Sequence, residues 1–70
     1  MQEDNAMRFH IMWRRINEPE DAYRDFFQTN DILEAKDFAM RLAFEETNRV
    51  YVWDEARRER VRDFDDPMYR

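Results

Sequence analysis

The sequence predicts a small α+β domain in which one helix packs across a face of an antiparallel sheet. Three observations carry this prediction. Apolar and polar residues alternate over residues 7–14, apolar residues recur at helical spacing over residues 31–47, and the β-branched and aromatic run RVYVW follows. The expected order is strand–strand–helix–strand. The sheet has three strands, or four if the chain returns after residue 54.

The first strand is expected at MRFHIMWR, where Met7, Phe9, Ile11 and Trp13 alternate with more polar residues. A period of two in apolar residues is typical of a strand with one buried face. The polar segment INEPED then predicts a turn.

The next segment, AYRDFFQT, is compatible with two structures. Asn17 and Glu20 are spaced as in a capping box, which favours a helix. Its aromatic residues and Thr29 are types enriched in strands. We favour a strand over residues 22–28, which forms a hairpin with the first.

The helix is expected from Asp31 to about Thr47. Asp31 is a good N-cap, and Glu34 stands at the position that completes a capping box. Asn48 suits the left-handed conformation that ends many helices, because this chain contains no glycine. These two ends bracket the longest periodic segment of the chain.

The third strand is expected at RVYVWD, with Val50 and Val52 on one face and Tyr51 and Trp53 on the other. Residues 55–62 are ambiguous again.

Asp54 is a candidate cap for a short helix that ends near Arg62. Alternatively, DEARRE is a loop and RVRDF returns as a fourth strand, with Val61 and Asp63 inward. The single domain then spans residues 7–64, with flexible termini at residues 1–6 and 65–70.

Composition argues against catalysis. The chain has 70 residues, no cysteine and no serine, and its only histidine is His10. Serine and cysteine nucleophiles are therefore excluded, and a lone histidine is a poor metal site. We expect no enzyme activity, no cofactor and no metal. Without an apolar run long enough to span a membrane or a secretory leader, we expect a cytoplasmic protein.

The helix carries more apolar surface than one sheet face needs. On a helical wheel its main apolar stripe comprises Ile32, Ala35, Phe38, Ala39, Leu42 and Ala43. A second stripe, about a quarter turn away, comprises Leu33, Met40 and Phe44.

A surface helix normally buries a single apolar stripe. We therefore predict a partner-binding surface made of Leu33, Met40 and Phe44 with the neighbouring Asp37 and Arg41. The partner is another protein or a second copy of the chain. In the alternative, the C-terminal residues Phe64, Met68 and Tyr69 fold over the second stripe.

Nucleic-acid binding is a weaker alternative. Arginines at 57–62 with Arg14 and Arg15 would supply a basic stripe, and Trp13, Trp53 and Tyr51 would supply stacking faces for a single strand. Interleaved acidic residues and a net charge of −5 argue against it.

The layout carried by RFHIMWRR, YRDFFQTNDILEAKDFAMRLAFEETN and VYVWDE resembles small phage-encoded proteins. These include anti-CRISPR proteins and inhibitors of host RNA polymerase, which act by occupying a surface of a larger machine. The resemblance implies a stoichiometric inhibitor or modulator of a host complex, acting in the host cytoplasm. It assigns no individual residue.

Overall fold

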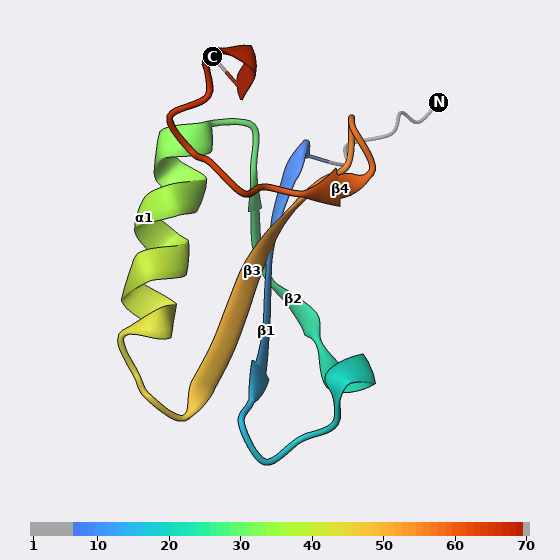
Figure 1. Cartoon of the computed structure of the whole chain (residues 1–70), viewed down its shortest axis with the longest axis vertical. Helices are drawn as coiled ribbons and strands as arrows, with labels where there is room; N and C mark the ends of the chain where they lie inside the picture. Colours follow the sequence, from blue (N-terminus) through green and yellow to red (C-terminus); the bar gives the residue numbers. More distant parts are fainter. Residues whose placement is uncertain (1–6, 70) are drawn as a thin grey trace.

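The chain forms two layers, a sheet and one helix lying across it (Figure 1). A computed structural model describes residues 7–69. The elements are β1 (Phe9–Arg15), η1 (Glu20–Ala22), β2 (Arg24–Thr29), α1 (Ile32–Ala43), β3 (Asn48–Asp54), β4 (Glu59–Arg60) and η2 (Pro67–Tyr69). The α+β class and the strand–strand–helix–strand order with a fourth strand are confirmed. Residues 1–6 and 70, expected to be flexible, lie outside the described residues.

The sheet has the order β2-β1-β3-β4, and each neighbouring pair is antiparallel. β2 and β3 are therefore parallel to each other, with β1 between them. The segment after the first turn is a strand, as favoured, and its helical alternative is wrong. The short 3-10 turn at Glu20–Ala22 has no side-chain cap, so the expected Asn17–Glu20 box does not form.

The alternation predicted for β1 places its apolar face against α1. Phe9 and Ile11 are completely buried, and Val52 of β3 lies directly opposite Ile11. Seven buried apolar residues form the core: Phe9, Ile11, Ile32, Ala35, Val52, Val61 and Tyr69. Core residues therefore come from β1, β3, α1 and the C-terminal segment.

The start of α1 is predicted correctly, but its end is not. The Asp31 carboxylate accepts a 2.9 Å hydrogen bond from the Leu33 N–H, as an N-cap does. Glu34 does not complete a direct capping box. Its carboxylate instead accepts from the Thr29 hydroxyl, and that hydroxyl accepts from the Asp31 N–H.

The helix ends at Ala43, four residues earlier than expected. Asn48 is not the left-handed residue, because it already belongs to β3 opposite Arg15. Its side-chain amide instead donates 2.9 Å to the Leu42 carbonyl, which satisfies an acceptor at the helix end. The one positive φ among residues 7–69 is at Arg58, in the turn between β3 and β4.

The chain returns after β3 as an antiparallel strand and not as a helix, but β4 covers only Glu59–Arg60, whereas the strand was expected over residues 60–64. β4 pairs with β3 through Trp53–Arg60 and Asp54–Glu59. Val61 is buried as expected, and its N–H donates 2.9 Å to the Val52 carbonyl. Asp63, expected to point inward, is exposed.

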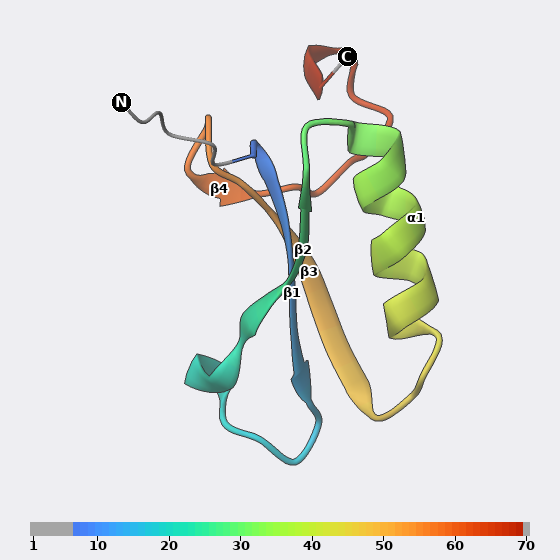
Figure 2. The ribbon, with the colours of Figure 1, turned by 180° about the vertical axis from the view of Figure 1, so that it is seen from behind.

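The C-terminal segment contributes to the core, although residues 65–70 were expected to be loose. After β4 the chain crosses to the N-terminal end of α1, which both views show (Figure 2). There Tyr69 is buried and its ring meets that of Phe9 edge-on at 5.9 Å. One aromatic side chain thus closes the end of the core.

A partly buried ion pair ties Arg8, just before β1, to Asp54 at the end of β3. Asp54 is completely buried, and its two carboxylate oxygens accept 2.9 and 3.0 Å hydrogen bonds from the Arg8 guanidinium. The same carboxylate accepts from the backbone N–H groups of Ala56 and Arg57, which shapes the turn into β4. A buried charge needs such complete hydrogen bonding to be tolerated.

Burial by itself raises the pKa of Asp54, but the hydrogen bonds and charge of Arg8 outweigh it, assisted by the two backbone N–H donors. The net pKa of Asp54 therefore lies below its ordinary value. The Asp54 carboxylate likewise raises the pKa of Arg8. The pair is charged at neutral pH.

We expect acid to remove the stabilisation that Asp54 provides. Because its folded pKa is depressed, that contribution is complete above the unfolded pKa of about 4 and is lost as pH falls through the folded value. Urea unfolding of the wild type between about pH 6 and pH 2 should show this loss.

Asp54→Asn should lower the free energy of unfolding at pH 7 by about 3 kcal/mol, because it leaves Arg8 without its charged partner. It should also flatten the acid profile. Glu20→Gln is the matched control, since its pair with Arg14 is on an 84% exposed side chain, and it should change little. An unaltered acid profile in Asp54→Asn would contradict this role.

Candidate protein-binding surface

One face of α1 packs against the sheet. Ile32 and Ala35 are buried, and Phe38 stacks on Phe27 of β2 with ring centroids 4.2 Å apart. Ala39 and Leu42 are half-buried beside them. Ala43, expected in this stripe, is exposed where the helix ends.

The second apolar stripe is bare. Leu33 is 56% exposed, Met40 62% and Phe44 86%. We call Leu33, Asp37, Met40, Arg41 and Phe44 the outer stripe. Its members recur every three or four residues, so they share one side of the helix over about 16 Å.

The C-terminal residues do not cover the outer stripe. Phe64 and Tyr69 pack against the core, and Met68 is itself 51% exposed. Tyr69 borders only the first turn of α1, in a shallow hollow with Ile32 and Leu33. The middle and C-terminal parts of the outer stripe lie beyond that segment.

Two opposite charges sit within the outer stripe. Arg41 and Asp37 form a 3.2 Å ion pair across one helical turn, with both side chains exposed. Such a pair adds only a few tenths of a kcal/mol to the helix. With Met40 and Phe44 these two residues line a shallow hollow.

A neighbouring groove extends this surface to the edge of the sheet. It is lined by Phe26, Phe38, Arg41 and Leu42, so Arg41 borders both hollows. Phe26 is 50% exposed because it is the extra residue of a β-bulge, where the register between β1 and β2 shifts.

Sequence reasoning missed Phe26. The sequence does contain a signal for the bulge: Phe26 and Phe27 are adjacent aromatic residues. Two successive residues of a regular strand cannot both face the helix. Only a bulge lets Phe27 stack on Phe38 while Phe26 lies on the same side, against Trp13 at 6.5 Å.

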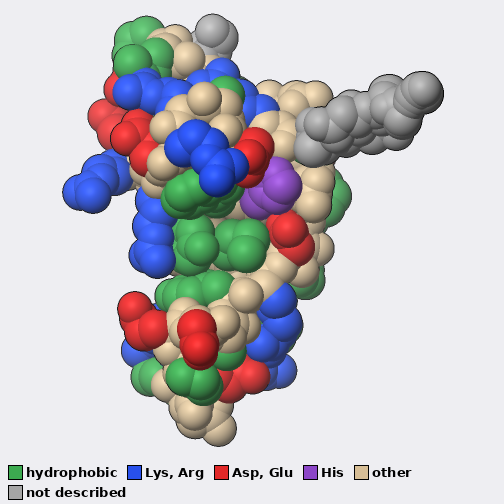
Figure 3. Space-filling model, turned by 90° about the vertical axis from the view of Figure 1, so that its right-hand side faces the viewer, with side chains coloured by type: hydrophobic (Ala, Val, Ile, Leu, Met, Phe, Trp, Pro, Cys, Tyr) green, Lys and Arg blue, Asp and Glu red, His purple; other side chains and the backbone are tan. Residues whose placement is uncertain are grey.

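The opposite face of the sheet carries hydrophobic side chains among charged ones (Figure 3). Tyr23 and Tyr51 meet with ring centroids 4.7 Å apart, and the Arg60 guanidinium lies 3.8 Å from the centre of the Tyr51 ring. The Arg58 guanidinium likewise lies 5.8 Å from the centre of the Trp53 ring. The side chains of this face therefore already stack on one another.

The structure separates the residues suggested for nucleic-acid stacking. Trp13 shares the helix side of the sheet with Ile11, whereas Tyr51 and Trp53 are on the other side. The arginines of residues 57–58 are paired with Glu59 and Glu55. The set therefore divides between the two faces of the sheet: Trp13 lies on the helix side, whereas Arg60 and Arg58 cover Tyr51 and Trp53 on the other side.

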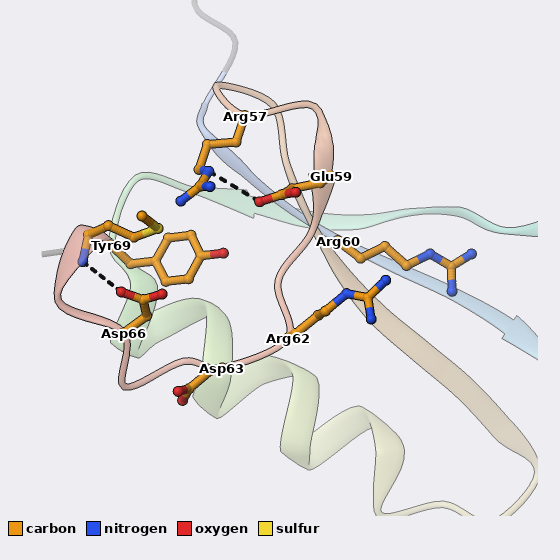
Figure 4. A pocket seen from close by; sticks show the side chains of 8 residues that line it. Arg57, Glu59, Arg60, Arg62, Asp63, Asp66 and Tyr69 are labelled. Carbon is orange, nitrogen blue, oxygen red and sulfur yellow. Dashed lines mark hydrogen bonds and ion pairs between the residues drawn. The ribbon is translucent and has the colours of Figure 1, made fainter.

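A third hollow lies between β4 and the C-terminal segment (Figure 4). Its lining has both signs of charge: Arg57, Glu59, Arg60, Arg62, Asp63, Asp66, Met68 and Tyr69. Arg57 and Glu59 form a 3.1 Å ion pair on the β4 side of the hollow, and burial raises the pKa of Tyr69 in the same lining. The mixture favours neither an anion nor a cation.

Residues 7–69 contain no group of three or more His, Cys, Asp or Glu side chains placed to hold a metal ion. His10 contacts the Met7 carbonyl at 2.9 Å and Asp25 at 3.4 Å. Within the same residues, no helix is long and apolar enough to cross a membrane.

In comparisons with known proteins, no family model matches the chain, and no curated protein and no solved structure matches it. Its function is therefore inferred from the geometry described above.

We expect the exposed residues of the outer stripe to contribute little to folding. Met40→Ala and Phe44→Ala should each change the free energy of unfolding by about 0.5 kcal/mol or less. Phe38→Ala, on the sheet side of the same helix, should lower it by about 2 kcal/mol or more. Urea unfolding compares the three. A loss at Phe44 as large as that at Phe38 would show that the chain itself buries Phe44.

Proposed function

We propose that this chain is a non-catalytic protein-binding domain that docks through the outer stripe and so modulates or inhibits a larger complex. The observation that carries the proposal is the exposure of Leu33, Met40 and Phe44 on one side of a helix whose other side already covers the sheet. Contiguous apolar surface of this kind typically marks an interaction site.

The chemistry of the outer stripe supports a protein partner. Leu33, Met40 and Phe44 run along the stripe, and Asp37 and Arg41 provide both signs of charge on one flank of these apolar residues. Protein interfaces combine an apolar centre, enriched in aromatic residues and Met, with a polar rim. An amphipathic helix laid in an apolar groove is a common form of such recognition.

The identity of the larger complex is proposed from the resemblance stated above. Small phage-encoded proteins with this layout occupy surfaces of host machines such as RNA polymerase or CRISPR effectors. By that resemblance the chain acts in the host cytoplasm and inhibits a host complex by covering part of its surface.

Site-specific photocrosslinking tests the proposal. A photoreactive amino acid at Leu33 should give one defined polypeptide adduct in cells that carry the protein. The same group at Met68, which is similarly exposed but outside the outer stripe, should not give that adduct.

Adding Met40→Asp and Phe44→Asp should abolish the Leu33 adduct, because charges then replace the apolar centre of the contact. The unfolding midpoint of this variant reports whether the fold is retained. An adduct that survives both substitutions, or one equally strong from Met68, would argue against the outer stripe as the binding surface.

A further inference from the structure

The outer stripe has a sequence symmetry that bears on its partner. Leu33 and Phe44 are equally far from the midpoint of the helix segment between Phe38 and Ala39. Asp37 and Met40 are also equally far from that midpoint, and Arg41 lies one residue beyond, about 1.5 Å along the axis. Reversing the helix about this midpoint therefore exchanges the apolar ends, Leu33 and Phe44, and brings Asp37 within one residue of the position of Arg41.

This symmetry makes the outer stripe complementary to an antiparallel copy of itself. If two α1 helices pack antiparallel about a two-fold axis, Leu33 of each lies opposite Phe44 of the other. Each Asp37 then lies within one residue of the other copy's Arg41, on the same flank of the interface. Because a two-fold interface uses each contact twice, both apolar pairs and both charge pairs form.

The parallel arrangement lacks this complementarity. About a two-fold axis along the helices, Asp37 and Arg41 of one copy would lie on the opposite flank of the interface from those of the other, so no Asp37–Arg41 contact would form between the copies. The charge order in the outer stripe thus selects the antiparallel pairing.

The exposed area suits a dimer of modest stability. Phe44 is 86% exposed, Met40 62% and Leu33 56%. An aromatic side chain can bury roughly 150–250 Å². With Leu33 and Met40, each copy offers several hundred Å², somewhat below the roughly 800 Å² per partner of a standard interface.

We infer that the outer stripe is occupied by a second copy of this chain, with the two α1 helices antiparallel and Asp37 paired with Arg41 across the two-fold axis. This inference rests on the proposed protein-binding role of the outer stripe: in the free protein a second copy covers this surface, and a larger complex has to displace that copy in order to bind. In the dimer the aromatic faces of both sheets point outward.

Charge exchange tests the inference on the purified full chain. Sedimentation equilibrium over a wide concentration range should give a mass that rises from 8.9 kDa toward twice that value. Asp37→Arg alone, or Arg41→Asp alone, should weaken the dimer at least about tenfold, because two like-charge contacts replace two attractive ones.

Mixing the two single variants is the sharper measurement. One copy then carries Arg at 37 and 41 and the other carries Asp at both, so every cross-axis contact is attractive again. We expect the mixture to form a one-to-one dimer that neither variant forms alone. Met68→Asp, outside the stripe, should leave the wild-type dimer unchanged, and circular dichroism should show the same fold throughout.

A mass of 8.9 kDa at every concentration up to about 1 mM would overturn the inference. A dimer that ignores both charge substitutions would also overturn it. In either case a Leu33 adduct with a different polypeptide leaves the proposed function standing, whereas the absence of any such adduct removes the proposed function as well.

Discussion

The fold depends on one buried carboxylate. Asp54 binds Arg8 through both oxygens and accepts two backbone N–H bonds, so a single side chain joins the start of β1, the end of β3 and the turn into β4. That turn directs the chain toward Val61, whose burial brings the C-terminal segment across to Tyr69. In a chain without cysteine, this network and a small apolar core supply the cross-links that a disulfide would otherwise provide.

The helix α1 carries more apolar surface than the sheet and the C-terminal segment cover. The sheet offers the helix one concave face, and that face is filled by Phe9, Ile11, Val52 and their neighbours. The C-terminal segment ends at the first turn of α1, on Phe9. Residues farther along the outer side, above all Met40 and Phe44, therefore stay exposed among residues 7–69. The stripe that packs on the sheet and the outer stripe, which we propose for binding, lie on different sides of one helix.

Local patterns predicted the elements whose structure depends on nearby residues. Alternation located β1 and β3, and Asp31 marked the start of α1. Local patterns could not predict contacts between distant residues: Arg8 and Asp54 are 46 residues apart, and Tyr69 reaches Phe9 across almost the whole chain.

Two local features were also predicted wrongly. The helix end was misplaced because Asn48 caps it with a side chain from within β3, and Phe26 was missed because a bulge breaks the alternation. Exposure of Leu33, Met40 and Phe44 agrees with the two-stripe pattern, since the helical period alone separates them from the core side.

Methyl NMR of the methionines measures the central claim, that a second copy covers the outer stripe, most directly. With a soluble paramagnetic agent present, the Met40 methyl signal should become protected from broadening as protein concentration rises. The Met68 methyl, exposed outside the stripe, should be broadened equally at every concentration. Met40 and Met68 methyl groups that remain equally accessible throughout the concentration range would contradict the account.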